Sequence, residues 1–152
     1  MSNVRHLDPD PMSLLLLFSA QAPWQNTLVA TARRLSSEGH SEVAVVTAIM
    51  ACETAAERAF AYWFRKRGIA ELEEATTDLF PSYSLANERV RKYYVAVSGD
   101  KIQEAEFWPQ YKAAAKLRGE VVHGGTRATQ AQAEKAVAAS AAFTAHLAQA
   151  AK

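Results

Sequence analysis

Small and apolar side chains recur with helical spacing between residues 41 and 67. They stand at steps of 4, 3, 4, 4 and 3 residues, at Val45, Ile49, Cys52, Ala56, Phe60 and Trp63. Such steps place all six on one face of an α-helix. Arg65-Lys66-Arg67 suits the negative end of a helix dipole, and Gly68 is a common helix stop. The sequence therefore predicts one long helix over residues 41–67, capped by Ser41.

The composition favours helices in the rest of the chain as well. The 152 residues include 31 Ala but only 6 Gly and 5 Pro, and Ala is the strongest helix former. Capping residues, glycines and apolar spacing predict further helices over about residues 23–38, 69–79, 85–97, 103 or 109 to 123, and 129–152. The expected fold is all-α, a bundle of about five to six helices in one domain over residues 23–152.

Local signals set the ends of several predicted helices. Pro23 suits the first turn of a helix, and Ser84 is the predicted cap of the helix over residues 85–97. Thr129 and Gln132 have the spacing of a capping box. The stripe of the last helix that we expect to be buried consists of Val137, Ser140, Thr144 and Leu147.

Residues 1–22 are expected to form an N-terminal arm. Their apolar run, Leu14–Phe18, is far shorter than the ~20 residues of a membrane span. A signal peptide is an alternative, because Arg5 precedes the run and Ala20-Gln21-Ala22 resembles a cleavage site, but acidic residues and prolines before the run argue against it. We expect the arm to pack its leucines on the protein or on a partner. A cytoplasmic location without membrane contact agrees with the single Cys52.

The charge balance limits the function classes that the chain fits. The formal net charge is only +1, so no overall basic field attracts nucleic acid from a distance, although a local RNA site remains possible. A lone Cys52 forms no internal disulfide, and no group of Cys and His has zinc-finger spacing. We expect no metal and no cofactor.

The segment whose residues are best suited to catalysis runs from Lys116 to Gly125. It contains Arg118 and His123, with four residues between them, and Gly124 follows the histidine. A His can act as a base on a ribose 2′-hydroxyl while an Arg stabilises the charge that grows on the phosphate. Five helical residues turn the two side chains about 140° apart. A joint site therefore needs long side-chain reach, a frayed helix end or a second protomer.

This segment resembles the HEPN domains, an all-α family whose hallmark is an Arg, four to six residues and a His, late in the bundle. Arg118 and His123 match the hallmark positions, Gly124 matches the Gly that follows, and residues 48–53 resemble the small, apolar segment ending in an acid, here Glu53. The resemblance implies a homodimer in which two motifs face each other. It also implies a metal-independent endoribonuclease of the toxin, defence or RNA-processing type, with RNA as substrate and an antitoxin or other protein as a candidate partner. Gly119 departs from the Asn or other polar residue that many members carry.

Other residues are open to two interpretations. Glu53 either orients Arg118 or forms a surface pair with Arg58 or a neighbouring helix. Tyr83, Asn87 and Arg91 either bind RNA by stacking and phosphate contacts, or belong to a helix start and the core.

Two functions rival the nuclease at this stage. One is a HEPN-like module that has lost strong catalysis through Gly119 and binds RNA, a nucleotide or a protein. The other is a structural helical dimer without a ligand.

Overall fold

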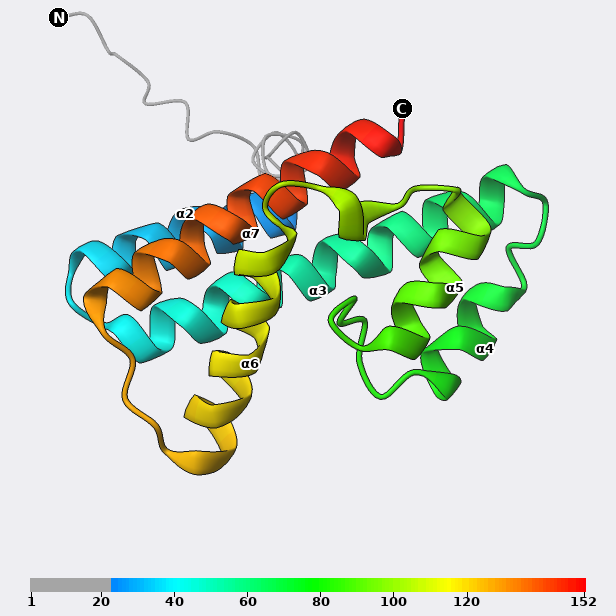
Figure 1. The fold of residues 1–152 in the computed structure, drawn as a ribbon. Helices are drawn as coiled ribbons and strands as arrows, with labels where there is room; N and C mark the ends of the chain where they lie inside the picture. The colour runs from blue at the N-terminus through cyan, green and yellow to red at the C-terminus, as the bar shows by residue number, and fades with distance from the viewer. Residues whose placement is uncertain (1–22) are drawn as a thin grey trace, which may run out of the picture.

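The computed structural model describes residues 23–152, and these residues form six α-helices and one short 3-10 helix without any strand (Figure 1). Residues 1–22, with the predicted arm and its Leu14–Phe18 run, lie outside the described part. The elements in chain order are α2 (Trp24–Ser37), α3 (Ser41–Lys66), α4 (Leu72–Leu79), α5 (Glu88–Ser98), η1 (Ile102–Glu104), α6 (Trp108–Gly124) and α7 (Gln130–Ala150). The predicted all-α bundle is confirmed.

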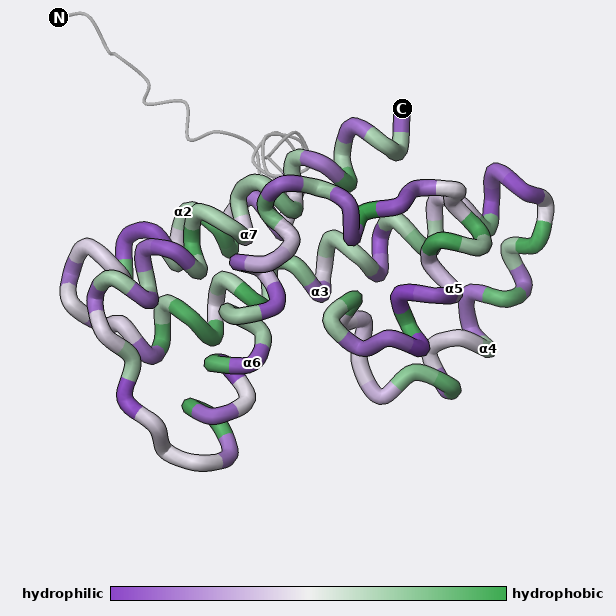
Figure 2. Tube along the Cα trace, viewed as in Figure 1, coloured by the Kyte–Doolittle hydropathy of each residue, from purple (hydrophilic) through white to green (hydrophobic). Residues whose placement is uncertain are grey.

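Helix α3 is the centre of the fold. Its 26 residues give it a length of about 39 Å, and the other five α-helices pack against it. Helices α2 and α7 lie along its N-terminal part with α6 beside them, whereas α4 and α5 lie beside its C-terminal part (Figure 1). Hydrophobic positions alternate with hydrophilic ones along these helices, as expected for helices with one buried face (Figure 2).

Small side chains let α3 and α7 pack closely. Ala44, Ala48 and Cys52 of α3 are fully buried, and so is Ser140 of α7 to within 1%. The Ser140 hydroxyl donates a hydrogen bond of 2.6 Å to the backbone oxygen of Ala48 and accepts one of 3.4 Å from the Cys52 thiol. The predicted buried stripe of the last helix is confirmed, because Val137, Ser140, Thr144 and Leu147 are all buried.

Aromatic rings fill the space between the C-terminal part of α3 and the helices α4 and α5. Phe60 lies at the centre, with ring centroids of Phe64, Phe80, Tyr83 and Tyr94 at 5.5 to 5.7 Å. The fold thus has a small-residue core at one end of α3 and an aromatic core at the other.

The observed caps of α5 and α7 show whether two predicted helix starts are right. Thr129 and Gln132 form the predicted capping box at the start of α7. Helix α5, however, begins at Glu88 and is capped by Asn87, whose side-chain oxygen accepts hydrogen bonds from the backbone of Arg89 and Val90. Ser84 is therefore not the cap, because the segment from Leu85 to Asn87 is held as a turn in front of the helix.

Some predicted helix starts shift by a residue or more. Pro23 stands just before α2 rather than in its first turn, and His40 takes the cap position before Ser41. The predicted helix over residues 69–79 begins only at Leu72.

Candidate functional site

The residues of the predicted motif all lie on α6, an unbroken helix from Trp108 to Gly124. Its inner face buries Trp108, Tyr111, Ala114 and Leu117 against α3 and α7. Gly125 ends the helix in the left-handed conformation, with a φ of 64°, and its backbone N–H donates to the oxygen of Glu120. The helix thus continues one residue beyond the predicted end at His123, and it is not frayed at the motif.

Arg118 and Glu53 lie half-buried on two helices that pack together, α6 and α3. The Nε atom of Arg118 is buried, and no hydrogen-bond partner for it is found in residues 23–152. Burial raises the pKa of the Glu53 carboxyl above its usual range, and the positive charge of Arg118 offsets part of that rise. The charges of the two groups therefore interact, although no ion pair within 4.0 Å joins them in the described chain.

His123 lies apart from Arg118 in a single protomer. Its side chain is exposed in the last turn of α6, whereas Arg118 is half-buried. Because the helix is regular between them, the two side chains project about 140° apart round its axis. One protomer therefore does not bring Arg118 and His123 to a common point.

Tyr83, Asn87 and Arg91 each make a contact within the fold. The Tyr83 hydroxyl hydrogen-bonds to that of Thr77 at 3.0 Å, and Asn87 caps α5. The Arg91 guanidinium donates to the backbone oxygen of Leu85 at 3.2 Å and lies 5.3 Å from the centre of a Trp108 ring. None of the three forms a hydrogen bond or ion pair with Arg118, Glu53 or His123 in the described chain.

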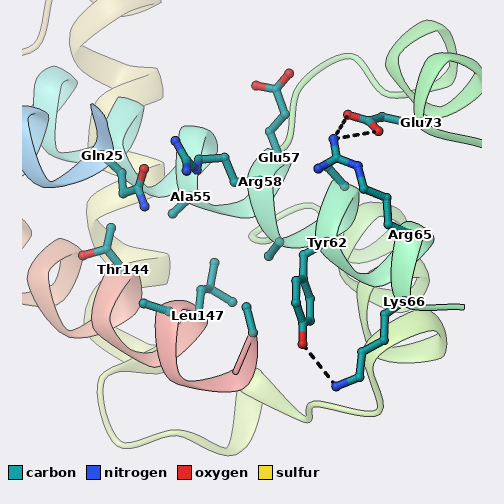
Figure 3. Close-up of a pocket in the computed structure, with 14 residues that line it drawn as sticks. Gln25, Ala55, Glu57, Arg58, Tyr62, Arg65, Lys66, Glu73, Thr144 and Leu147 are labelled. Carbon is teal, nitrogen blue, oxygen red and sulfur yellow. Dashed lines mark hydrogen bonds and ion pairs between the residues drawn. The ribbon is translucent and has the colours of Figure 1, made fainter. Parts of the chain in front are cut away.

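A cavity on another face of α3 contains none of the predicted site residues (Figure 3). Its volume is about 680 Å³. It is lined by side chains of α2, α3, α4 and α7, among them Gln25, Arg58, Tyr62, Arg65, Lys66 and Glu73. Arg65 bonds to both oxygens of Glu73 at 3.2 Å, and Lys66 donates to the Tyr62 hydroxyl at 3.1 Å. The sequence indicated only that Arg65 and Lys66 lie at a helix end, and no pattern in it predicts that Glu73 bonds to Arg65.

A second groove lies directly beside the motif, between α6 and α7. Its volume is about 430 Å³. Its lining is apolar at the base and polar at the rim, with Pro109, Gln110, Ala113, Ala114, Lys116, Leu117, Glu120, Gln132, Lys135 and Ala136. Sequence reasoning missed this groove, because it depends on how α7 packs beside α6.

Residues 23–152 contain neither a cluster of metal ligands nor a helix that could span a membrane. No three His, Cys, Asp or Glu side chains come together in a way that would hold a metal ion. No helix of this part combines the length and the apolar character needed to cross a membrane.

Comparisons with known proteins do not add a relative to this picture. No family model, no curated protein and no solved structure matches the chain.

Proposed function

We propose that the protein is a HEPN-type endoribonuclease that acts as a homodimer through Arg118 and His123 and needs no metal ion. The observation that carries the proposal is the arrangement on α6. Its Arg118 is half-buried and its charge acts on the carboxyl of Glu53, while His123 is exposed at the end of the same helix. A guanidinium and an accessible imidazole are two groups that can together support metal-free RNA cleavage.

Cleavage by these groups follows from ordinary acid–base chemistry. His123 accepts the proton of a ribose 2′-hydroxyl, and the 2′-oxygen attacks the adjacent phosphorus. Arg118 stabilises the extra negative charge on the phosphate oxygens. The bond from phosphorus to the 5′-oxygen breaks, and that oxygen takes a proton from water. The products are a 2′,3′-cyclic phosphate and a 5′-hydroxyl end.

In this proposal, a second protomer is what brings an Arg118 and a His123 close together. Within one chain the two side chains diverge by about 140° on a regular helix. A two-fold arrangement can place the Arg118 of one protomer next to the exposed His123 of its partner. The proposal thus requires that the active species is a dimer. A cytoplasmic location, which agrees with the single Cys52, is part of this proposal, and so is a toxin, defence or RNA-processing role, which follows only from the family resemblance.

The test uses His123→Ala and Arg118→Ala in a buffer with a chelator. We expect the parent protein to cut single-stranded RNA and both variants to lose cleavage by at least the 10²-fold that a positioned acid or base supplies. His40→Ala and Arg34→Ala are matched controls, since His40 is also exposed and Arg34 also lies a few residues before a histidine. If His123→Ala cuts as well as His40→Ala, the nuclease assignment is wrong.

The alternative function is a binding module with weak or no catalysis. Gly119 favours this alternative, because it lacks the polar side chain that many members of the resembled family carry at this position. The space for such a side chain is open, since nothing lies within 4 Å of the place where a Cβ would stand. Gly119→Asn should therefore fit and should raise cleavage if this side chain is what the parent lacks. If neither protein cuts RNA but both bind it, the binding module replaces the nuclease.

A further inference from the structure

Two lysines share one face of α6 with His123. Lys116 follows Lys112 by four residues, and His123 follows Lys116 by seven. At 100° per residue, these steps keep all three side chains within about 40° round the helix axis. They span about 16 Å along that axis, and all three side chains are exposed. A row of positive charge therefore leads along α6 to the histidine of the proposed site.

The row borders the groove between α6 and α7. Lys116 stands on one wall of this groove and Lys135, from α7, on the other. The buried residues of its lining are apolar, and they are Ala114, Leu117 and Ala136. Cations along the rim of a groove can follow the phosphate backbone of a single-stranded nucleic acid.

The competing charges on this face are few. Glu120 lies in the same groove and pairs with Lys116 at 3.7 Å, with side-chain exposures of 46% and 80%. An exposed pair of this kind contributes little, so a phosphate can replace the carboxylate at the lysine. Lys112 and Lys135 form no ion pair within residues 23–152. The groove lining thus offers two accessible cations, Lys116 and Lys135, against one carboxylate, and Lys112 adds a third cation on the same face of α6.

We propose that Lys112, Lys116 and Lys135 bind the phosphates of a single-stranded RNA that lies along the α6–α7 groove and reaches His123. The choice of RNA as the occupant rests on the proposed function. The complementary charge of Lys116 and Lys135 and the position of His123 on the same face of α6 as Lys116 support it. The contacts are to the backbone, so they set the position of the strand and not its sequence.

Binding is measured by the fluorescence anisotropy of a labelled single-stranded RNA, with His123→Ala as the background so that the RNA stays intact. Each phosphate contact that is lost lowers the slope of log affinity against log salt by about 0.7 for single strands. Lys112→Gln with Lys116→Gln should therefore lower the slope by about 1.4, and Lys135→Gln alone by about 0.7. Affinity at low salt should fall in both cases, regardless of RNA sequence.

Lys92→Gln with Lys101→Gln is the matched control for the double variant. Both lysines are exposed and pair with a glutamate one turn away, Glu88 and Glu104, as Lys116 does. The charge change is the same, so the control should leave the salt slope unchanged. Equal slopes for the two double variants would overturn the inference, and so would a background protein that binds no RNA.

The outcomes for cleavage and for binding are separable. If the unmodified protein cuts RNA but the α6 lysine variants bind like the controls, the proposed function stands and the groove assignment fails. If the protein never cuts RNA but the α6 lysines alone change the salt slope, the groove assignment stands and the nuclease fails. Cleavage kinetics add a third readout, since loss of these lysines should raise KM and leave kcat nearly unchanged.

Discussion

Two glycines in the same segment should respond in opposite ways to replacement by alanine. Gly119 lies inside α6, five residues before its last residue, and a Cβ there would meet nothing within 4 Å. Ala is more favourable than Gly in a helix interior by up to about 1 kcal/mol. Since no steric cost opposes this gain, Gly119→Ala should stabilise the protein by about 0.5 to 1 kcal/mol.

Gly125 is the opposite case. Its φ of 64° lies in the left-handed region, which costs a residue with a Cβ about 1 to 2 kcal/mol. Gly125→Ala should therefore destabilise the protein by about that amount. Gly124→Ala is the control between them, because its φ is not positive and its Cβ would meet the Thr126 hydroxyl at an ordinary 3.6 Å.

Urea unfolding at one fixed protein concentration measures all three variants. With an m-value of about 1.5 kcal/mol/M, Gly119→Ala should raise the midpoint by about 0.3 to 0.7 M. Gly125→Ala should lower it by about 0.7 to 1.3 M at the same m-value. A lower midpoint for Gly119→Ala would refute the reasoning, because it would mean that position 119 is neither helical nor open. An unchanged midpoint for Gly125→Ala would refute the left-handed helix end.

Three further outcomes follow from buried polar groups. Burial raises the folded-state pKa of Glu53, so the folded state binds more protons than the unfolded state. The parent protein should therefore lose stability relative to Glu53→Gln as the pH rises above 4.5. Urea midpoints from pH 4 to 7 measure this difference. Burial raises the pKa of the Cys52 thiol to about 12, so a thiol reagent should label the native protein only at the rate of unfolding, and fast labelling in buffer would contradict the packing. Ser140→Ala removes the bond to Ala48 and should cost about 1 kcal/mol, whereas Ser37→Ala, whose exposed hydroxyl bonds to a helix oxygen, should cost less in the same assay.

The helices could be predicted because their signals are local. The apolar steps of α3 and the capping box at Thr129 depend only on residues a few positions apart, so both appear in the sequence and in the structure. The cap of α5 could not be chosen in this way, because Ser84 and Asn87 are both good capping residues. Tertiary contacts decide between them. Leu85 is fully buried, and the backbone N–H of Ala86 donates to the Tyr111 hydroxyl of α6, so the helix starts only after them.

The residues of the candidate site could be picked out in the sequence, but their arrangement could not. The spacing of Arg118 and His123 was visible, and the structure adds that one is half-buried and the other exposed. The position of Glu53 near Arg118 depends on how α3 and α6 pack, which no local pattern encodes. The same holds for His146, whose Nε2 lies 2.9 Å from an oxygen of Asp100, 46 positions away in the sequence.

The bond between Ser140 and Ala48 has a consequence for the order in which the chain is made. The two residues are 92 positions apart, and α7 packs against both of the earlier helices α2 and α3. On the ribosome, the alanine face of α3 stays without its partner until the residues of α7 have emerged. Exposed apolar surface in such an incomplete chain is a site for chaperone binding and for aggregation. Slow or interrupted translation after α6 should therefore be more harmful to this protein than an equal delay before α3.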